Sequence, residues 1–293
     1  MQLTVMIPCY NGAATIAEQL EALARQEWDG DWEVVVSDNG STDETREIVQ
    51  GFSDRVPNLR IVDSSNIRGI ANARNVAVRE TRSPWLLTCD ADDVVADNYV
   101  AAMAEAFGDH DFIACRLDVQ RLNEPWLIES WPCGQESSLP DFSPSFLPSG
   151  AGASLGFKRH VFDKVGGFDP DPKIWGREDN DFCWRVQLAG IPLHFVAETA
   201  IYYRYPTAYS RMFQQSRFLA RSSVQLYKRY QPFGMPRLPR RKALRGRVRW
   251  KRILAQLRHL KRADRVQRAR FVRDLGHKVG RVEGSIRYRV LAF

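Results

Sequence analysis

Long apolar stretches are missing from this chain of 293 residues, although 44% of its residues are hydrophobic. No segment reaches the ~18 consecutive apolar residues of a membrane-spanning helix, and the first residues lack the pattern of a secretory signal. We therefore expect a protein that is neither integral to a membrane nor secreted through a visible signal. Its apolar content suffices for a substantial core.

Cysteine is scarce, with five residues that form no Cys-x-x-Cys pair and have no histidine nearby at ligand spacing. This argues against a zinc-binding pattern and against a disulfide framework. We expect reduced thiols in a cytosolic compartment, most of them ordinary buried side chains. They are Cys9, Cys89, Cys115, Cys133 and Cys183.

Acidic residues almost disappear after residue 205. Residues 206–293 hold 25 Lys and Arg against 3 Asp and Glu, whereas residues 1–205 hold 17 against 32. The sequence therefore predicts two regions that meet near Pro206: an α/β domain over residues 1–205 and a basic, amphipathic helical region over residues 206–293.

Apolar residues recur at helical spacing among the many Lys and Arg of the second region. One set is Trp250, Ile253, Leu254, Leu257 and Leu260, and the other is Phe271, Val272, Leu275, Val279 and Val282. A basic amphipathic helix favours an anionic membrane surface, which is our first interpretation. Packing on the acidic first region ranks second, and binding of nucleic-acid phosphates ranks third.

Strand and helix signals alternate through the first region. Apolar runs predict strands and helical spacing predicts helices. The strands are expected at residues 3–7, 32–37, 59–62 and 85–89, and helices at 13–25 and 69–79. Such alternation predicts an α/β fold with a mostly parallel sheet and helices on both faces.

Three carboxylates, Asp90, Asp92 and Asp93, follow the fourth predicted strand. Residues two apart on a strand point the same way, so Asp90 and Asp92 can meet one hard cation, Mg²⁺ or Mn²⁺. Open α/β sheets bind ligands beyond the carboxyl ends of their strands. We expect a metal-diphosphate site here, with an acidic turn that caps the next helix as the plainer alternative.

A second acidic group occupies residues 178–181, at the start of a predicted helix. Acids there stabilise the helix dipole by ~0.3–1 kcal/mol without any chemistry. One of them can also act as a general base whose pKa is tuned by its neighbours. Trp175 can stack on a sugar ring, and Gly150 and Gly152 can let an acceptor approach the backbone.

In this order, the motifs resemble those of the family 2 glycosyltransferases, inverting enzymes built on the A-type nucleotide-sugar-binding fold, GT-A. The resemblance covers about residues 3–205. It rests on residues 7–11, 37–43, 66–75, 90–93, 167–169 and 178–179.

The resemblance implies a role for several residues. Asp179 would be the catalytic base, supported by Glu178. Asp90 and Asp92 would hold the ribose and the metal ion. Asp38 would contact the nucleobase of the donor, and Arg74 would lie near the nucleotide. The donor-binding set would be Pro8, Tyr10, Asp38, Arg74, Asp90 and Ala91. The acceptor set, which follows from the residue types described above and not from the resemblance, is Trp175, Gly150 and Gly152.

The sequence departs from the family pattern in three places. Family members often have a histidine where this chain has Tyr203, and His194 lies earlier, so the third protein ligand of the metal stays open. Processive synthases combine this core with membrane spans and a Gln-x-x-Arg-Trp segment; residues 214–218 match it only in part, which favours the addition of one sugar at a time. Residues 115–148 match no pattern and would hold acceptor specificity.

We therefore expect a metal-dependent inverting glycosyltransferase that moves a single sugar from a nucleoside diphosphate sugar to a hydroxyl of a glycan or lipid-linked acceptor. We expect a UDP-sugar as the donor. We expect the protein to act in cell-envelope or polysaccharide biosynthesis, at the cytoplasmic face of the membrane. Two alternatives stay open: a non-catalytic nucleotide-sugar-binding protein, which needs no base, and a nucleic-acid-binding protein that acts through the basic region.

Overall fold

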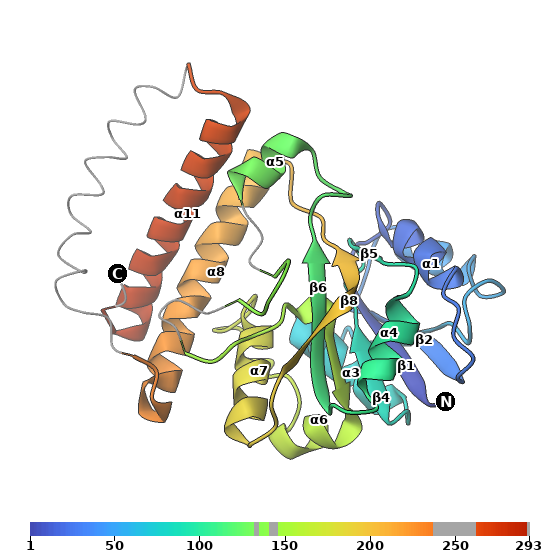
Figure 1. The fold of residues 1–293 in the computed structure, drawn as a ribbon. Coiled ribbons are helices and arrows are strands. Elements are labelled where there is room, and N and C mark those ends of the chain that lie inside the picture. Colours follow the sequence, from blue (N-terminus) through green and yellow to red (C-terminus); the bar gives the residue numbers. More distant parts are fainter. Residues whose placement is uncertain (132–134, 141–145, 237–261, 292–293) are drawn as a thin grey trace.

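A curved eight-stranded sheet forms the centre of the molecule (Figure 1). The structure is a computed structural model that describes residues 1–131, 135–140, 146–236 and 262–291. In sheet order the strands are β3 (Arg60–Asp63), β2 (Trp32–Asp38), β1 (Leu3–Cys9), β4 (Trp85–Thr88), β7 (Leu155–Lys158), β6 (Phe112–Asp118), β8 (His194–Tyr202) and β5 (Val94–Val95).

Most strands of this sheet run in one direction. β1 pairs in parallel with β2 and β4, β2 with β3, and β6 with β8. β7 lies antiparallel between β4 and β6, and β5 is antiparallel to β8. The prediction of a mostly parallel α/β sheet is confirmed, and the parallel strands β1, β2 and β4 bring their carboxyl ends to one edge.

Both faces of the sheet are buried, because neighbouring residues of each strand pack into different cores. In β1, Val5 and Ile7 enter one core while Met6 enters the other. The first core is completed by α1 (Ile16–Ala24), α2 (Thr45–Gln50) and α4 (Tyr99–Ala106), and the second by α3 (Ile70–Glu80), α6 (Arg159–Val165), α7 (Glu178–Leu188) and α8 (Tyr209–Tyr230). This double burial explains why the strands are continuous apolar runs.

The long helices α8 and α11 (Arg265–Tyr288) lie side by side at one flank of the sheet, with α5 (Pro125–Ser130) against the first part of α11 (Figure 1). Two short 3₁₀ helices, η1 (Gly152–Ser154) and η2 (Gln231–Phe233), complete the described elements. Three glycines of α11 face α8: Gly276, Gly280 and Gly284 are spaced by four and touch its backbone or side chains.

The basic region therefore packs on the sheet domain through the part of it that is described. Val224 and Tyr230 of α8 belong to the same core as the strands. The second apolar set of the sequence lies on α11, and the first set, residues 250–260, lies outside the described residues. A functional boundary near Pro206 stays a prediction, and so does binding to a membrane surface.

No described helix is both long enough and apolar enough to cross a membrane. Cys9, Cys89, Cys115 and Cys183 are buried free thiols, whereas Cys133 lies outside the described residues.

Candidate active site

A cavity of about 390 Å³ lies beyond the carboxyl ends of β1 and β2, beside the start of α3. This volume is in the range of small-molecule sites. The cavity is lined by Pro8 and Tyr10, both predicted to bind the donor, and by Trp175, predicted to contact the acceptor. Its other lining residues are Cys9, Asn39, Arg68, Gly69, Ile70 and Ala73.

One wall of the cavity depends on a glycine. Gly69 has a φ of +130°, in the region that favours glycine, and its amide donates to Asn39 Oδ1 at 2.8 Å. A Cβ at this position would lie 3.1 Å from the ring of Trp175. Gly69 therefore lets the indole lie directly on the loop before α3, on the same cavity as Pro8 and Tyr10.

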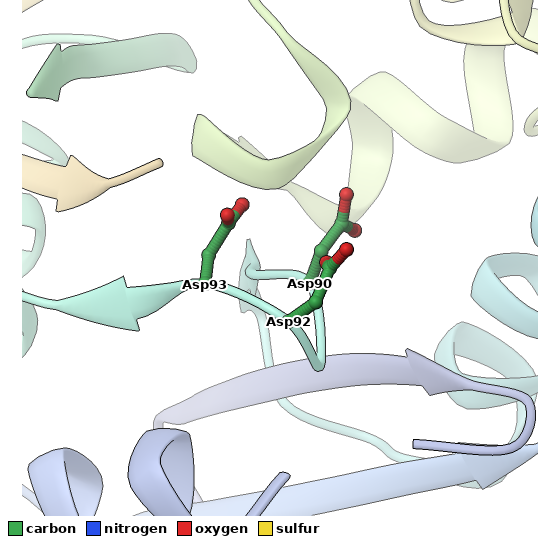
Figure 2. A group of neighbouring side chains, drawn as sticks. All are labelled: Asp90, Asp92 and Asp93. Atoms are coloured by element: carbon green, nitrogen blue, oxygen red, sulfur yellow. The ribbon is translucent and has the colours of Figure 1, made fainter. Parts of the chain in front are cut away.

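The three carboxylates predicted at the end of β4 lie in the turn between β4 and β5 (Figure 2). Asp90 and Asp92 lie side by side, and Asp93 points the same way from the other end of the turn. One oxygen of each lies within 4.8 Å of the other two. Asp93 thus joins the pair that the sequence selected.

The three acids fit a hard divalent cation, which takes carboxylate oxygens as ligands. Asp93 is 1% exposed, and its Oδ2 has no hydrogen-bond partner among the described residues. Burial, followed by the charges of Asp92 and Asp90, raises the pKa of Asp93 well above its usual value. Loss of water around the carboxylate and the charge of Asp90 likewise raise the pKa of Asp92 to about 6. A cation such as Mg²⁺ or Mn²⁺ would offset both effects.

Arg74 of α3 joins this acidic turn to the start of α7. Its Nη2 donates to Asp90 Oδ1 and its Nη1 to Glu178 Oε1, both at 3.0 Å. The side chain is 1% exposed, and a Cβ on Gly152 would lie 2.4 Å from its guanidinium. Gly152 is therefore glycine because the backbone of η1 lies against Arg74.

Asp179 lies on the other side of the same loop. Its Oδ2 accepts a hydrogen bond from the amide of Gly152 at 3.0 Å, and its Oδ1 accepts one from the amide of Asn180 at 2.7 Å. Unlike Glu178, the side chain of Asp179 is only partly buried. These contacts fix the carboxylate and leave it reachable, as a general base requires.

Glu178 is 3% exposed and faces inward. Its Oε2 accepts from the amide of Gly176 at 2.7 Å, while Arg74 binds the other oxygen. Burial and the charge of Asp179 raise the pKa of Glu178 to about 7, against the opposing effect of Arg74. Arg74, which also binds Asp90, offsets the two effects only in part.

Three other predicted residues lie away from the cavity lining. Asp38 is buried, and its carboxylate accepts from the amide of Ser41 at 3.0 Å and from Arg46 at 3.2 Å. Ala91 is buried in the first core. A Cβ on Gly150 would lie 2.6 Å from that of Ala114, so this glycine lies directly against side chains of the core. The roles implied for these residues stay predictions.

Tyr203, at the position where the family often has histidine, lies beside the acidic turn. The next amide, of Arg204, donates to Asp93 Oδ1 at 2.8 Å. Burial and the neighbouring carboxylates, Asp93 first, raise the pKa of Tyr203. His194 begins β8, at its opposite end, and stacks on His110 with ring centroids 3.6 Å apart.

The sequence model described as "Glycosyl transferase family 2" matches residues 4–166, more than half of the chain. This chain belongs to glycosyl transferase family 2. A second model, "N-terminal domain of galactosyltransferase", matches residues 142–208, which include Gly152, Glu178 and Asp179. The family that the motifs resemble is thereby confirmed.

Relatives of this family 2 chain include validoxylamine A glucosyltransferase of Streptomyces hygroscopicus subsp. jinggangensis, 30% identical over 65% of the chain and 52% of that protein. A teichoic acid poly(glycerol phosphate) polymerase of Staphylococcus epidermidis is 30% identical over 44% of the chain and 18% of that protein. The chain spans about half the length of the first relative, and less of the second.

Solved structures share the fold at lower identity. The mannosyltransferase PcManGT from Pyrobaculum calidifontis, in complex with GDP-Man and Mn²⁺, covers 97% of the chain with a TM-score of 0.66 and 19% identity. Residues 1–349 of Staphylococcus aureus TarS cover 99% of the chain with a TM-score of 0.55 and 20% identity. The expected GT-A fold is confirmed.

The structure adds residues to the site of this family 2 chain that the sequence did not single out. Asn39 shapes the cavity loop, and Arg68 holds its guanidinium 4.5 Å from the ring of Tyr10. Arg204 donates to the carbonyl of Asp92 at 2.9 Å. Arg68 lies in the segment from Asn66 to Asn75 that supported the resemblance, but its contact with Tyr10 forms only across the fold.

Proposed function

We propose that this protein transfers a single sugar from a nucleoside diphosphate sugar to an acceptor hydroxyl, with inversion at the anomeric carbon. Membership of family 2 supports this, and so does the juxtaposition, through Arg74, of the acidic turn and the Asp179 carboxylate. That juxtaposition is the observation that carries the proposal.

In this mechanism Asp179 takes the proton of the acceptor hydroxyl as that oxygen attacks the sugar. A positioned carboxylate contributes roughly 10²–10⁴-fold to such a step. The amides of Gly152 and Asn180 hold its two oxygens, so the carboxylate needs little reorganisation before it reacts. Glu178 does not take the proton; it supports the site by accepting hydrogen bonds from Arg74 and from the Gly176 amide.

The cavity between Tyr10 and Trp175 holds the nucleoside of the donor, and the acidic turn lies next to its diphosphate. Asp90, Asp92 and Asp93 would hold a Mg²⁺ or Mn²⁺ ion. When bound, this ion supplies a positive charge that offsets the charge developing on the departing diphosphate. Trp175 lines this cavity, so its ring can contact the donor as well as an acceptor sugar.

The choice of donor follows from similar proteins. TarS structures have been solved with UDP and with UDP-GlcNAc, and PcManGT with GDP-Man and Mn²⁺. These ligands support a nucleotide-sugar donor and a divalent ion. We place UDP-sugars first, and hexosyl transfer as the reaction.

The decisive experiment changes Asp179 to Asn in the full chain. We expect donor and metal binding to persist, and turnover to fall by at least 10²-fold because an amide cannot accept the proton. Glu178→Gln is the matched control and should be milder. The measurements are turnover with a UDP-sugar and an identified acceptor, donor affinity by calorimetry, and the anomeric configuration of the product.

Near-normal turnover of Asp179→Asn, or retention of configuration, would contradict the single-displacement mechanism. Equal donor affinity with and without a chelator would contradict the metal. Persistent donor binding by a protein that never transfers would favour the non-catalytic alternative.

We further propose that the acceptor is a glycan or lipid-linked molecule of the cell envelope and that the protein works at the cytoplasmic face of the membrane. A relative is named as a teichoic acid polymerase, and exposed cations lie along α11. Cosedimentation of the full chain with anionic vesicles should weaken as salt rises. Salt-dependent binding to DNA instead would favour the nucleic-acid alternative.

A further inference from the structure

Arg273 of α11 is a buried cation with no counter-charge in contact with it among the described residues. It is 6% exposed, and none of its three side-chain nitrogens has a hydrogen-bond partner in the part of the chain that the structure describes. All three nitrogens are also closed to solvent. Burial lowers its pKa to about 10, which leaves the side chain charged at neutral pH.

Aromatic rings are the neighbours of this guanidinium. Its carbon lies 3.9 Å from the ring centroid of Trp131 and 5.5 Å from that of Tyr205. Cation–π contacts of this kind are weak compared with the free-energy cost of dehydrating a buried ion. The rings therefore offset only part of the cost, and the guanidinium retains unused capacity for an anion.

The position of Arg273 relates it to the candidate active site. Its neighbour Tyr205 contacts the ring of Tyr203 at 5.7 Å. Tyr203 and Arg204 follow directly on β8, and the Arg204 amide binds Asp93. A continuous row of contacts thus runs from Arg273 to the acidic turn.

The surroundings of Arg273 add positive charge. Arg177 precedes Glu178 on the same side and is held by Ser223 of α8 at 3.2 Å and by Asn180 at 3.2 Å. His277 lies one turn after Arg273 on α11 and adds no charge at neutral pH, because loss of water and the charges of Arg281 and Arg177, against that of Asp274, lower its pKa to about 4. This flank of the site therefore favours a negatively charged ligand.

We propose that Arg273 binds a phosphate ester of the acceptor while the acceptor hydroxyl faces Asp179. A planar guanidinium suits a phosphate because it can donate two parallel hydrogen bonds. The arginine side chain must swing out of its place between the rings to reach the ester, since its nitrogens are covered. This inference rests on the proposed function and names its acceptor class.

The test uses the full chain, saturated with UDP and Mg²⁺ so that the donor site is closed to phosphate. Glycerol 1-phosphate is titrated by calorimetry, with glycerol as the uncharged comparison. Arg273→Met is compared with Arg270→Met, a control on the same helix whose exposed guanidinium binds Glu129 at 3.2 Å. Arg273→Lys is a second variant that keeps the charge but not the planar group.

We expect the wild type to bind glycerol 1-phosphate and not glycerol. Affinity should fall at least tenfold in Arg273→Met, fall less in Arg273→Lys and change less than twofold in Arg270→Met. Arg273→Met should unfold at the same or a higher temperature than the wild type, because an unpaired buried charge is gone. A merely structural cation would instead lower that temperature.

Equal affinities of the wild type and Arg273→Met, or no binding by the wild type, would overturn the proposal. Should Arg273→Met fail to fold, unchanged affinity in Arg273→Lys would count against it and reduced affinity for it. Titration with micelles of short-chain phosphatidic acid distinguishes a lipid phosphate ester from a soluble one. Binding of phosphatidic acid or of glycerol 1-phosphate that depends on Arg273 supports the proposal. Phosphate binding without sugar transfer would contradict the proposed function alone.

Discussion

At the scale of single residues, one buried guanidinium unites the candidate site. Arg74 bonds Asp90 in the acidic turn and Glu178 beside the predicted base, two residues that are 88 positions apart in the chain. The resemblance places Arg74 near the nucleotide, which stays a prediction, and its ion pairs in the structure are with these two carboxylates. We therefore interpret it as a positioning residue.

Replacement of Arg74 by Met should leave two carboxylates without their cation and lower the free energy of unfolding by about 3–5 kcal/mol. Arg74→Lys keeps the charge, but one ammonium cannot span both acids as the guanidinium does. We expect Arg74→Lys to lose kcat at least tenfold with little change in donor KM. Urea unfolding and steady-state kinetics measure both effects; a rise in donor KM alone would instead support direct contact with the nucleotide.

The pH dependence of stability should report on Glu178. Its pKa is raised from 4.5 to about 7, so the folded state binds this proton more tightly than the unfolded state does. The contribution of Glu178 to the free energy of unfolding is therefore fully present below pH 4.5. It is lost as pH rises towards 7, by at most ~1.4 kcal/mol per pH unit. Urea unfolding of the wild type and Glu178→Gln between pH 5 and 7.5 compares the slopes. Identical slopes would contradict the shift.

At the scale of elements, the contact of α8 with α11 depends on small residues. A Cβ on Gly280 would lie 2.0 Å from the carbonyl oxygen of Arg217, and one on Gly276 would lie 2.5 Å from that of Phe213. Side chains of any size would separate the two helices. The apolar periodicity of the sequence selected Leu275 and Val279, but the closest contacts are made by the glycine that follows each of them.

Gly280→Ala tests this packing. In an open helix the substitution should stabilise by up to about 1 kcal/mol, whereas overpacking at a tight contact costs about 1–3 kcal/mol. We expect a net loss of stability in urea unfolding, and a change within about 0.5 kcal/mol for Gln267→Ala on the exposed face. A stabilised Gly280→Ala would show that the helices separate without cost.

At the scale of the whole molecule, the basic region supports the helix that bears Asp179. Asp181 of α7 is fully buried and accepts from Arg229 at 2.7 Å and from Tyr230 at 2.8 Å, both on α8. Tyr230 also contacts the ring of Trp184 at 4.9 Å. The negative and positive regions of the sequence are thus joined by specific buried contacts.

A chain that ends at Tyr205 should therefore lose its cooperative thermal transition. The truncation exposes the core surface covered by Val224 and Tyr230 and removes two partners of the buried Asp181. Circular dichroism during heating, with limited proteolysis, measures the loss. A cooperative transition at the wild-type temperature would show that residues 1–205 fold independently.

The sequence alone determined the alternating α/β order, the family and the position of the acids at the end of β4, because these depend on local periodicity and on motifs of short span. Only the tertiary structure decided which distant residues meet: Arg74 with Glu178, Gly152 with Asp179, and Trp175 with Gly69. It also showed that α8 shares the core of the sheet. Contacts between residues far apart in the chain depend on how whole elements pack, and no local pattern encodes that packing.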